Sequence, residues 1–188
     1  MSRTIAIAAT LAALAVPGVA LAATVKGTSG DDPLTGTASA DTIFGKAGND
    51  TIDGLAGDDR LRGDRGEDTI VGGEGDDGIK GRQDADELDG GAGEDRISGG
   101  PGDDEILGGT EGDRIRAGAG ADGVEAGDGD DSVHSRDKHA DAVDCGAGED
   151  SVVADAKDTL TNCETVKVRK APSGLAKERP AKARGPKA

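Results

Sequence analysis

Aspartate recurs at every ninth residue along most of this chain, always in the same local setting. The pattern is clearest in GGAGEDRISGGPGDDEIL, residues 90–107, where glycine, aspartate and isoleucine follow twice in a fixed order. Carboxylates at this spacing, beside glycines that leave backbone carbonyls exposed, supply hard oxygen ligands. Such a set favours Ca²⁺ over the softer transition metals.

Twelve nonapeptides run without a gap from Gly27 to His134. The first position is glycine in ten units and the fourth in nine, the departures at the fourth being Ser39, Asp84 and Glu111. The sixth position is aspartate in every unit. The eighth is always aliphatic: Leu34, Ile43, Ile52, Leu61, Ile70, Ile79, Leu88, Ile97, Ile106, Ile115, Val124 and Val133.

Turns and very short strands must alternate to position these residues. Glycine at positions one, two and four predicts a tight turn that needs positive φ. The last three residues of a unit, such as Arg96–Ile97–Ser98, predict a strand with one inward side chain. The aspartate stands where turn becomes strand, so its carboxylate can face the carbonyls of a neighbouring turn.

Burial of the aliphatic column is too weak to fold such a chain alone. One buried Ile, Leu or Val contributes about 1.5–3 kcal/mol, whereas each ordered residue loses roughly 1–2 kcal/mol of conformational entropy. Stacked carboxylates add repulsion. If turns stack every second unit, ten pairs form, and about one Ca²⁺ per pair would supply on the order of +20 charges.

Charge divides the chain into an acidic body and a basic end. The chain has 33 glycines, one Phe, no Trp or Tyr, and a net charge of −16, which excludes an aromatic core. Residues 27–134 carry a net −20, residues 135–166 a net −5 and residues 167–188 a net +7. The acidic body argues against nucleic acid as a partner. The outward positions seven and nine are mixed, with no aromatic or threonine array that would indicate a ligand surface.

The N-terminus has the pattern of a secretory signal peptide. Residues 1–23 contain Arg3, an apolar run from Ile5 to Val16, a Pro17–Gly18 break and a small-x-small site after Ala22 or Ala23. The apolar run is shorter than the roughly 20 residues of a membrane-spanning helix. The sequence therefore predicts a secreted, extracellular protein with no membrane span.

With these motifs the sequence resembles the haemolysin-type calcium-binding repeats of the RTX family, whose nonapeptide is GGxGxDxUx. The resemblance covers residues 27–134. It implies an all-β, right-handed parallel β-roll (a β-solenoid) over residues 24–134, in which turns 18 residues apart share Ca²⁺. Without a catalytic or pore-forming region, the chain is similar to small secreted bacterial calcium-binding repeat proteins.

Carried over by position, the resemblance assigns calcium ligands to individual aspartates. The clearest pairs are Asp50 with Asp68, Asp59 with Asp77, Asp77 with Asp95, and Asp104 with Asp122. Weakened turns at Ser39, Asp84 and Glu111 put the sites of their own units in doubt. The expected metal ligands are Asp32, Asp50, Asp59, Asp68, Asp77, Asp95, Asp104, Asp122, Asp131 and Asp150.

Residues 135–166 predict irregular terminal coils. One inserted residue precedes a unit with Asp141 and Val143, and a deletion follows near Asp158. Cys145 and Cys163 are 18 residues apart, one full coil, and stacked strands lie about 4.8 Å apart, which suits a disulfide. The alternatives are two free buried thiols, or a metal pair with His134 and His139.

The basic tail, residues 167–188, lacks an apolar period and is expected to be disordered. It is either a tether to anionic cell-envelope polymers or to another copy's acidic roll, or a solubilising extension. No HExxH, GxSxG, Walker A or CxxC motif is present, so catalysis is not expected. A calcium-dependent adhesion or matrix module is the main alternative function, and a disordered ion buffer conflicts with the inward aliphatic column.

Overall fold

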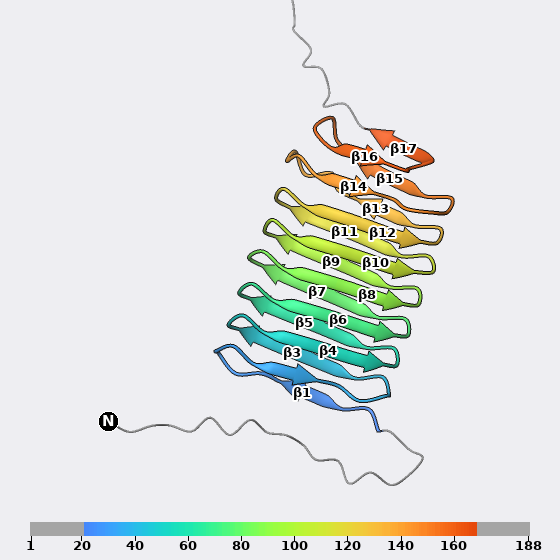
Figure 1. Ribbon diagram of the computed structural model, residues 1–188. Helices are drawn as coiled ribbons and strands as arrows, with labels where there is room; N and C mark the ends of the chain where they lie inside the picture. The colour runs from blue at the N-terminus through green and yellow to red at the C-terminus, as the bar shows by residue number, and fades with distance from the viewer. Residues whose placement is uncertain (1–20, 169–188) are drawn as a thin grey trace, which may run out of the picture.

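The computed structural model describes residues 21–168, which form a stack of flattened coils (Figure 1). The predicted signal peptide lies largely outside the described residues, and so does the basic tail after Val168. Residues 21–168 contain no helix, and hence none that could cross a membrane. The strands are β1 (Thr24–Lys26), β2 (Pro33–Thr35), β3 (Thr42–Ala47), β4 (Thr51–Ala56), β5 (Arg60–Arg65), β6 (Thr69–Glu74), β7 (Gly78–Gln83), β8 (Glu87–Ala92), β9 (Arg96–Pro101), β10 (Glu105–Thr110), β11 (Arg114–Ala119), β12 (Gly123–Asp128), β13 (Ser132–His134), β14 (Ala142–Asp144), β15 (Ser151–Ala154), β16 (Thr159–Thr161) and β17 (Thr165–Val168).

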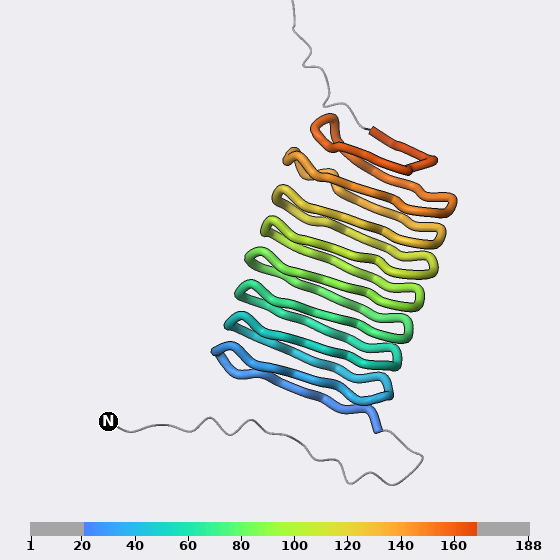
Figure 2. Tube along the Cα trace, in the orientation of Figure 1, coloured from blue at the N-terminus to red at the C-terminus, as the bar shows by residue number. Residues whose placement is uncertain are grey.

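The strands form two parallel sheets, one on each side of the coil. Odd-numbered strands make a nine-stranded sheet, called sheet A here, and even-numbered strands make the eight-stranded sheet B. Each strand pairs with the strand two further along, so that Ile79 lies beside Ile97 and Ile97 beside Ile115. One coil therefore contains two nonapeptides, as Figure 2 shows along the chain trace. The expected all-β solenoid is confirmed.

The aliphatic column fills the space between the sheets. All twelve residues at the eighth position are buried, with at most 8% of their surface exposed. Val143 and Val152 continue the column at the C-terminal end, and Val25 packs against it at the N-terminal end. The period of nine thus places one aliphatic side chain per strand in the core, as the sequence predicted.

The strands are longer than the sequence predicted. From β3 to β12 each has six residues, because positions one to three of a unit continue the preceding strand. In β4 the strand passes through Gly54, Leu55 and Ala56, and the next residue, Gly57, donates its N–H to the carbonyl of Glu74 in the following coil. Pairing with the adjacent coil keeps these glycines extended, so the turn is confined to positions four to six.

The last coils absorb the change in register that the sequence indicated. Val124 pairs with Val143, 19 residues on, and Val143 with Leu160, 17 residues on, instead of the usual 18. β17 ends the sheet and includes Lys167 and Val168, at the start of the segment expected to be disordered. Insertion and deletion compensate each other, and both sheets continue through residues 135–166.

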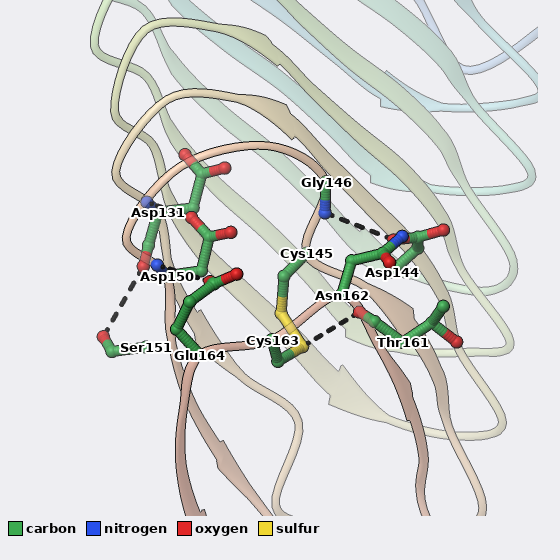
Figure 3. The surroundings of a disulfide bond; sticks show 10 residues. All are labelled: Asp131, Asp144, Cys145, Gly146, Asp150, Ser151, Thr161, Asn162, Cys163 and Glu164. Carbon is green, nitrogen blue, oxygen red and sulfur yellow. Dashed lines mark hydrogen bonds between the residues drawn. A yellow bond between two sulfur atoms is a disulfide. The ribbon is translucent and has the colours of Figure 1, made fainter.

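A disulfide joins the last two coils. Cys145 and Cys163 are bonded, with 5.1 Å between their Cα atoms and 18 residues between them in sequence. Figure 3 shows this bond beside the last turn, with Asp150 close to it. Cys145 is fully buried at position one of its unit. The predicted pairing is confirmed, and the free-thiol and metal-pair alternatives are wrong.

The adjacent residues Ile106 and Leu107 of β10 test the core directly. Ile106 is 1% exposed and Leu107 is 36% exposed. We expect Ile106→Ala to lower the free energy of unfolding by about 2–5 kcal/mol, because it leaves a cavity between the sheets. Leu107→Ala, on the outer face, should change it by about 0.5 kcal/mol or less. Urea unfolding in saturating Ca²⁺ measures both, and equal losses would contradict an inward column at position eight.

Candidate metal centre

The aspartates at the sixth position form one column along each edge of the coil. The Oδ1 atom of each accepts the backbone N–H of the aspartate one coil earlier, at N–O distances of 2.6–3.0 Å. One column contains Asp32, Asp50, Asp68, Asp86, Asp104, Asp122 and Asp141, and the other Asp41, Asp59, Asp77, Asp95, Asp113, Asp131 and Asp150. The structure therefore joins all four aspartate pairs that the sequence singled out.

The second carboxylate oxygen of nearly every column residue is buried and has no hydrogen-bond partner. Twelve Oδ2 atoms share this state: those of Asp50, Asp59, Asp68, Asp77, Asp86, Asp95, Asp104, Asp113, Asp122, Asp131, Asp141 and Asp150. Leaving a buried polar group unsatisfied costs about 1–3 kcal/mol, and more for a charged one. An arrangement repeated so often requires a bound proton or a cation at these oxygens.

Glycine at position one makes room for these oxygens. A Cβ atom built on Gly72 would lie 2.3 Å from Asp77 Oδ2 and 2.4 Å from the carbonyl oxygen of Gly90, one coil on. The carboxylate and the carbonyl therefore face the same small space. Positive φ occurs at positions two and four and not at position one, so the expectation of a left-handed backbone at position one was wrong.

Burial raises the pKa of the column carboxylates. The pKa rises to about 7 for Asp77, Asp86 and Asp113, where burial is the largest cause and neighbouring carboxylates add to it, while one backbone N–H partly offsets both. The same causes raise the pKa to about 6 for Asp68, Asp95, Asp122 and Asp141. At neutral pH the turns thus place negative charge where the surroundings disfavour it, and a divalent cation would reverse that balance.

The structure separates one expected ligand from the rest. Asp32, at the N-terminal end, is only partly buried, and its Oδ2 accepts hydrogen bonds from the backbone and hydroxyl of Thr28. Asp41 is similar, because Thr37 donates its N–H to Asp41 Oδ2. Neither carboxylate offers the unpaired buried oxygen found further along the stack.

Three aspartates that the sequence prediction omitted have the same surroundings as the rest: Asp86, Asp113 and Asp141. Asp84 and Glu111 replace the glycine of two turns, adopt φ of 74° and 71°, and accept the N–H of Gly66 and Gly93 from the previous coil. These hydrogen bonds keep the turns closed. The invariant sixth position was the better signal, and glycine at position four was weighted too heavily.

The donor set fits a hard cation. Within residues 21–168 no three His, Cys, Asp or Glu side chains come together in a group that could hold a metal ion by themselves. An ion in these turns would therefore combine carboxylate oxygens with backbone carbonyl oxygens, which Ca²⁺ accepts at 2.3–2.6 Å in flexible geometry.

Two glycines distinguish space from backbone freedom. Gly72→Ala places a methyl group against Asp77 Oδ2, and we expect a loss of about 1–3 kcal/mol from overpacking together with weaker Ca²⁺ binding. Gly123→Ala is the control, because no atom lies within 4 Å of a Cβ built there. Calcium titration and urea unfolding of both variants measure the difference. A Gly72→Ala protein that matches Gly123→Ala would show that the space beside the carboxylate is not used.

The comparison with known protein families agrees with this geometry. A family profile described as "RTX calcium-binding nonapeptide repeat (4 copies)" matches residues 26–61, 45–79, 53–86, 80–113 and 107–136. No curated protein sequence matches the chain. The matched segments overlap, extend over more than half of the 188 residues and coincide with the coils that contain the aspartate columns. The chain therefore belongs to the family of RTX calcium-binding nonapeptide repeats.

Proposed function

We propose that the protein is secreted and binds several Ca²⁺ ions between stacked turns, and that this binding drives its folding outside the cell without any catalytic activity. The observation that carries the proposal is the row of unpaired, buried aspartate oxygens along both edges of the coil. Bound Ca²⁺ supplies positive charge to these oxygens, and the chain supplies carboxylates and turn carbonyls already held in a row.

The ligands in this proposal are the committed set from Asp50 onward, extended by Asp86, Asp113 and Asp141. Asp32 is the weakest member, because Thr28 already satisfies its carboxylate. Each ion would lie between aspartates one coil apart, such as Asp59 and Asp77, whose backbone and carboxylate are already joined. Binding at one turn then favours the next, since each coil contacts only its neighbours.

Coupling of folding to calcium follows from the balance of forces. With a single aliphatic residue per strand, the core cannot offset the conformational entropy of the chain. A ligand that binds only the folded state adds stability according to its concentration and affinity. The low Ca²⁺ of a cell interior would keep the chain unfolded during export, and the higher Ca²⁺ outside would fold it.

The partners and the location in this proposal rest on the two ends of the chain. The N-terminal signal pattern supports secretion, and the net +7 of residues 167–188 supports a tether to anionic cell-envelope polymers. Binding of the full chain to such a polymer, compared with a variant whose tail Lys and Arg residues are replaced by Gln, would test the tether. Equal binding by the two proteins would contradict it.

Adjacent aspartates give a matched test of the calcium sites. Asp77 is buried with an unpaired Oδ2, whereas Asp76 is exposed and accepts the N–H of Glu94. We expect Asp77→Asn to raise the Ca²⁺ midpoint for folding several-fold and to lower stability in saturating Ca²⁺ by about 1–3 kcal/mol. Asp76→Asn should shift the free energy of unfolding by about 0.5 kcal/mol or less.

Circular dichroism during calcium titration is the measurement. The chain should gain β-structure as Ca²⁺ rises to millimolar concentration, and isothermal titration should count the ions. If the purified protein bound many ions without gaining β-structure, it would be a disordered buffer. If Asp76→Asn and Asp77→Asn had equal effects, the buried columns would not be the sites.

The raised pKa values also predict how the metal-free protein responds to pH. Because the folded-state pKa of Asp77 and Asp113 is about 7, above the ordinary 3.8, the fold binds more protons than the unfolded chain between these values. Metal-free stability should therefore fall as pH rises from about 4 to 7. In calcium-free buffer the β-signal at pH 5 should exceed that at pH 7.5, while the Ca²⁺ midpoint should be higher at pH 5.5. A metal-free signal that is weaker at pH 5 would contradict the ionisation argument.

A further inference from the structure

Positive side chains gather on one sheet of the solenoid. All nine Lys and Arg residues between positions 27 and 134 lie in strands of sheet A, and the only acidic residue in that sheet's strands is Asp64. The nine residues are Lys46, Arg60, Arg62, Arg65, Lys80, Arg82, Arg96, Arg114 and Arg116. The outward positions, which seemed mixed in the linear sequence, are therefore sorted by sheet.

Sheet B has the opposite character. Its eight strands contain no Lys or Arg and include eight acidic residues: Asp53, Glu74, Glu87, Asp89, Glu105, Glu125, Asp128 and Asp144. Val71 and Leu107 are exposed on the same face. The solenoid thus has a cationic outer face on sheet A and an anionic outer face on sheet B, separated by the thin aliphatic core.

On each face, like charges lie directly opposite each other on neighbouring strands. Arg96 pairs in register with Arg114 on sheet A, and Glu87 with Glu105 on sheet B. All four side chains are exposed. Such cross-strand pairs destabilise a sheet, and the fold does not require them, because any polar residue could occupy an outward position. A partner of opposite charge over each face would remove the penalty.

Both faces have shallow grooves lined by one sign of charge. The groove on sheet A is lined by Lys80, Arg82, Arg96, Arg114, Arg116 and His134, without any carboxylate. Asp64 lies within 4.0 Å of Arg62 and Arg82 only, and among residues 21–168 no carboxylate comes this close to Arg96, Arg114 or Arg116. On sheet B the corresponding groove is lined by Glu105, Leu107, Glu125 and Asp144, without Lys or Arg.

We propose that the sheet A face of one molecule binds the sheet B face of a second copy of the same chain. Neighbouring strands are about 4.8 Å apart in either sheet, so rows of cations and rows of anions have the same spacing and can face each other coil for coil. One kind of partner then relieves the like-charge repulsion on both faces. An acidic polysaccharide would cover sheet A alone, and nucleic acid would find no aromatic side chain in the groove on which to stack its bases.

The available area is sufficient for a specific complex. Six residues at about 3.3 Å and eight strands at about 4.8 Å give roughly 760 Å² per face, or about 1,500 Å² in total. This total lies within the range of standard protein–protein interfaces, about 1,600 ± 400 Å². Because the contact joins two different faces, it leaves a free face at each end, and the molecules form an open stack instead of a closed dimer.

Sedimentation of the calcium-loaded full-length protein tests the proposal. With folding verified first by circular dichroism, we expect a weight-average mass at least twice that of the monomer in 0.1 M salt. The monomer should return in 1 M salt, where the Debye length falls from about 10 Å to about 3 Å. A chain that fails to fold in Ca²⁺ would refute the proposed calcium function, whereas a folded protein that is monomeric in 0.1 M salt would refute this interface.

Charge reversal identifies the two faces. The triple variant Arg96→Glu, Arg114→Glu, Arg116→Glu should be monomeric, and so should Glu87→Lys, Glu105→Lys, Glu125→Lys. An equimolar mixture of these two variants should associate again, because the anionic faces of one meet the cationic faces of the other. The control Glu67→Lys, Glu94→Lys, Glu149→Lys changes the same charge at exposed turn positions and should associate like the unaltered protein.

Other outcomes would overturn the proposal. Association that survives the Arg→Glu triple substitution would place the contact elsewhere, for example between the basic tail and the acidic turns. A mixture of the two reversed variants that stays monomeric would exclude pairing of the two faces. A monomeric protein that binds dextran sulfate, and loses this binding with the Arg→Glu substitutions, would assign the cationic face to an acidic polysaccharide.

Discussion

A buried carboxylate with one satisfied and one unsatisfied oxygen is the interaction on which the rest of this structure depends. Oδ1 fixes the distance between coils by accepting a backbone N–H from the preceding coil, as Asp77 does from Asp59. Oδ2 faces the interior of the turn without a partner. The first oxygen makes the stack regular, and the second makes its stability conditional on what neutralises the charge.

Several features of the repeat follow from this requirement. Position one is glycine because a side chain there would occupy the space of Oδ2. Position four tolerates Asp84 and Glu111, because a left-handed residue can be compensated by a hydrogen bond from its own side chain. The interior of the turn is therefore more restrictive than its backbone shape. Towards the C-terminus position one becomes Ala117, Ala126 and then Cys145, all fully buried, and a covalent bond joins the last coils.

The sequence predicted the parts of the structure that depend on a strict period. The inward aliphatic column, the 18-residue coil, the aspartate pairs and the disulfide all follow from counting, and the structure places each as expected. Strand length did not follow, because the pairing of Gly54 or Gly57 with the next coil is a contact between coils, which local glycine propensity does not reveal. For the same reason Asp86 and Asp113 were undervalued: side chains of Asp84 and Glu111 reach across coils to repair their turns.

The distribution of surface charge shows which period governs function. A nine-residue repeat treats both sheets alike, and it determines the shape: turn, core residue and carboxylate are the same in odd and even units. A property that distinguishes the two faces needs a period of 18, and Lys and Arg follow that longer period throughout residues 27–134. Because neither the core nor the turns depend on this sorting, the difference between the faces must act on something outside the solenoid. The nonapeptide thus explains how the chain folds with calcium, and the pair of nonapeptides indicates how the folded coil meets its neighbour.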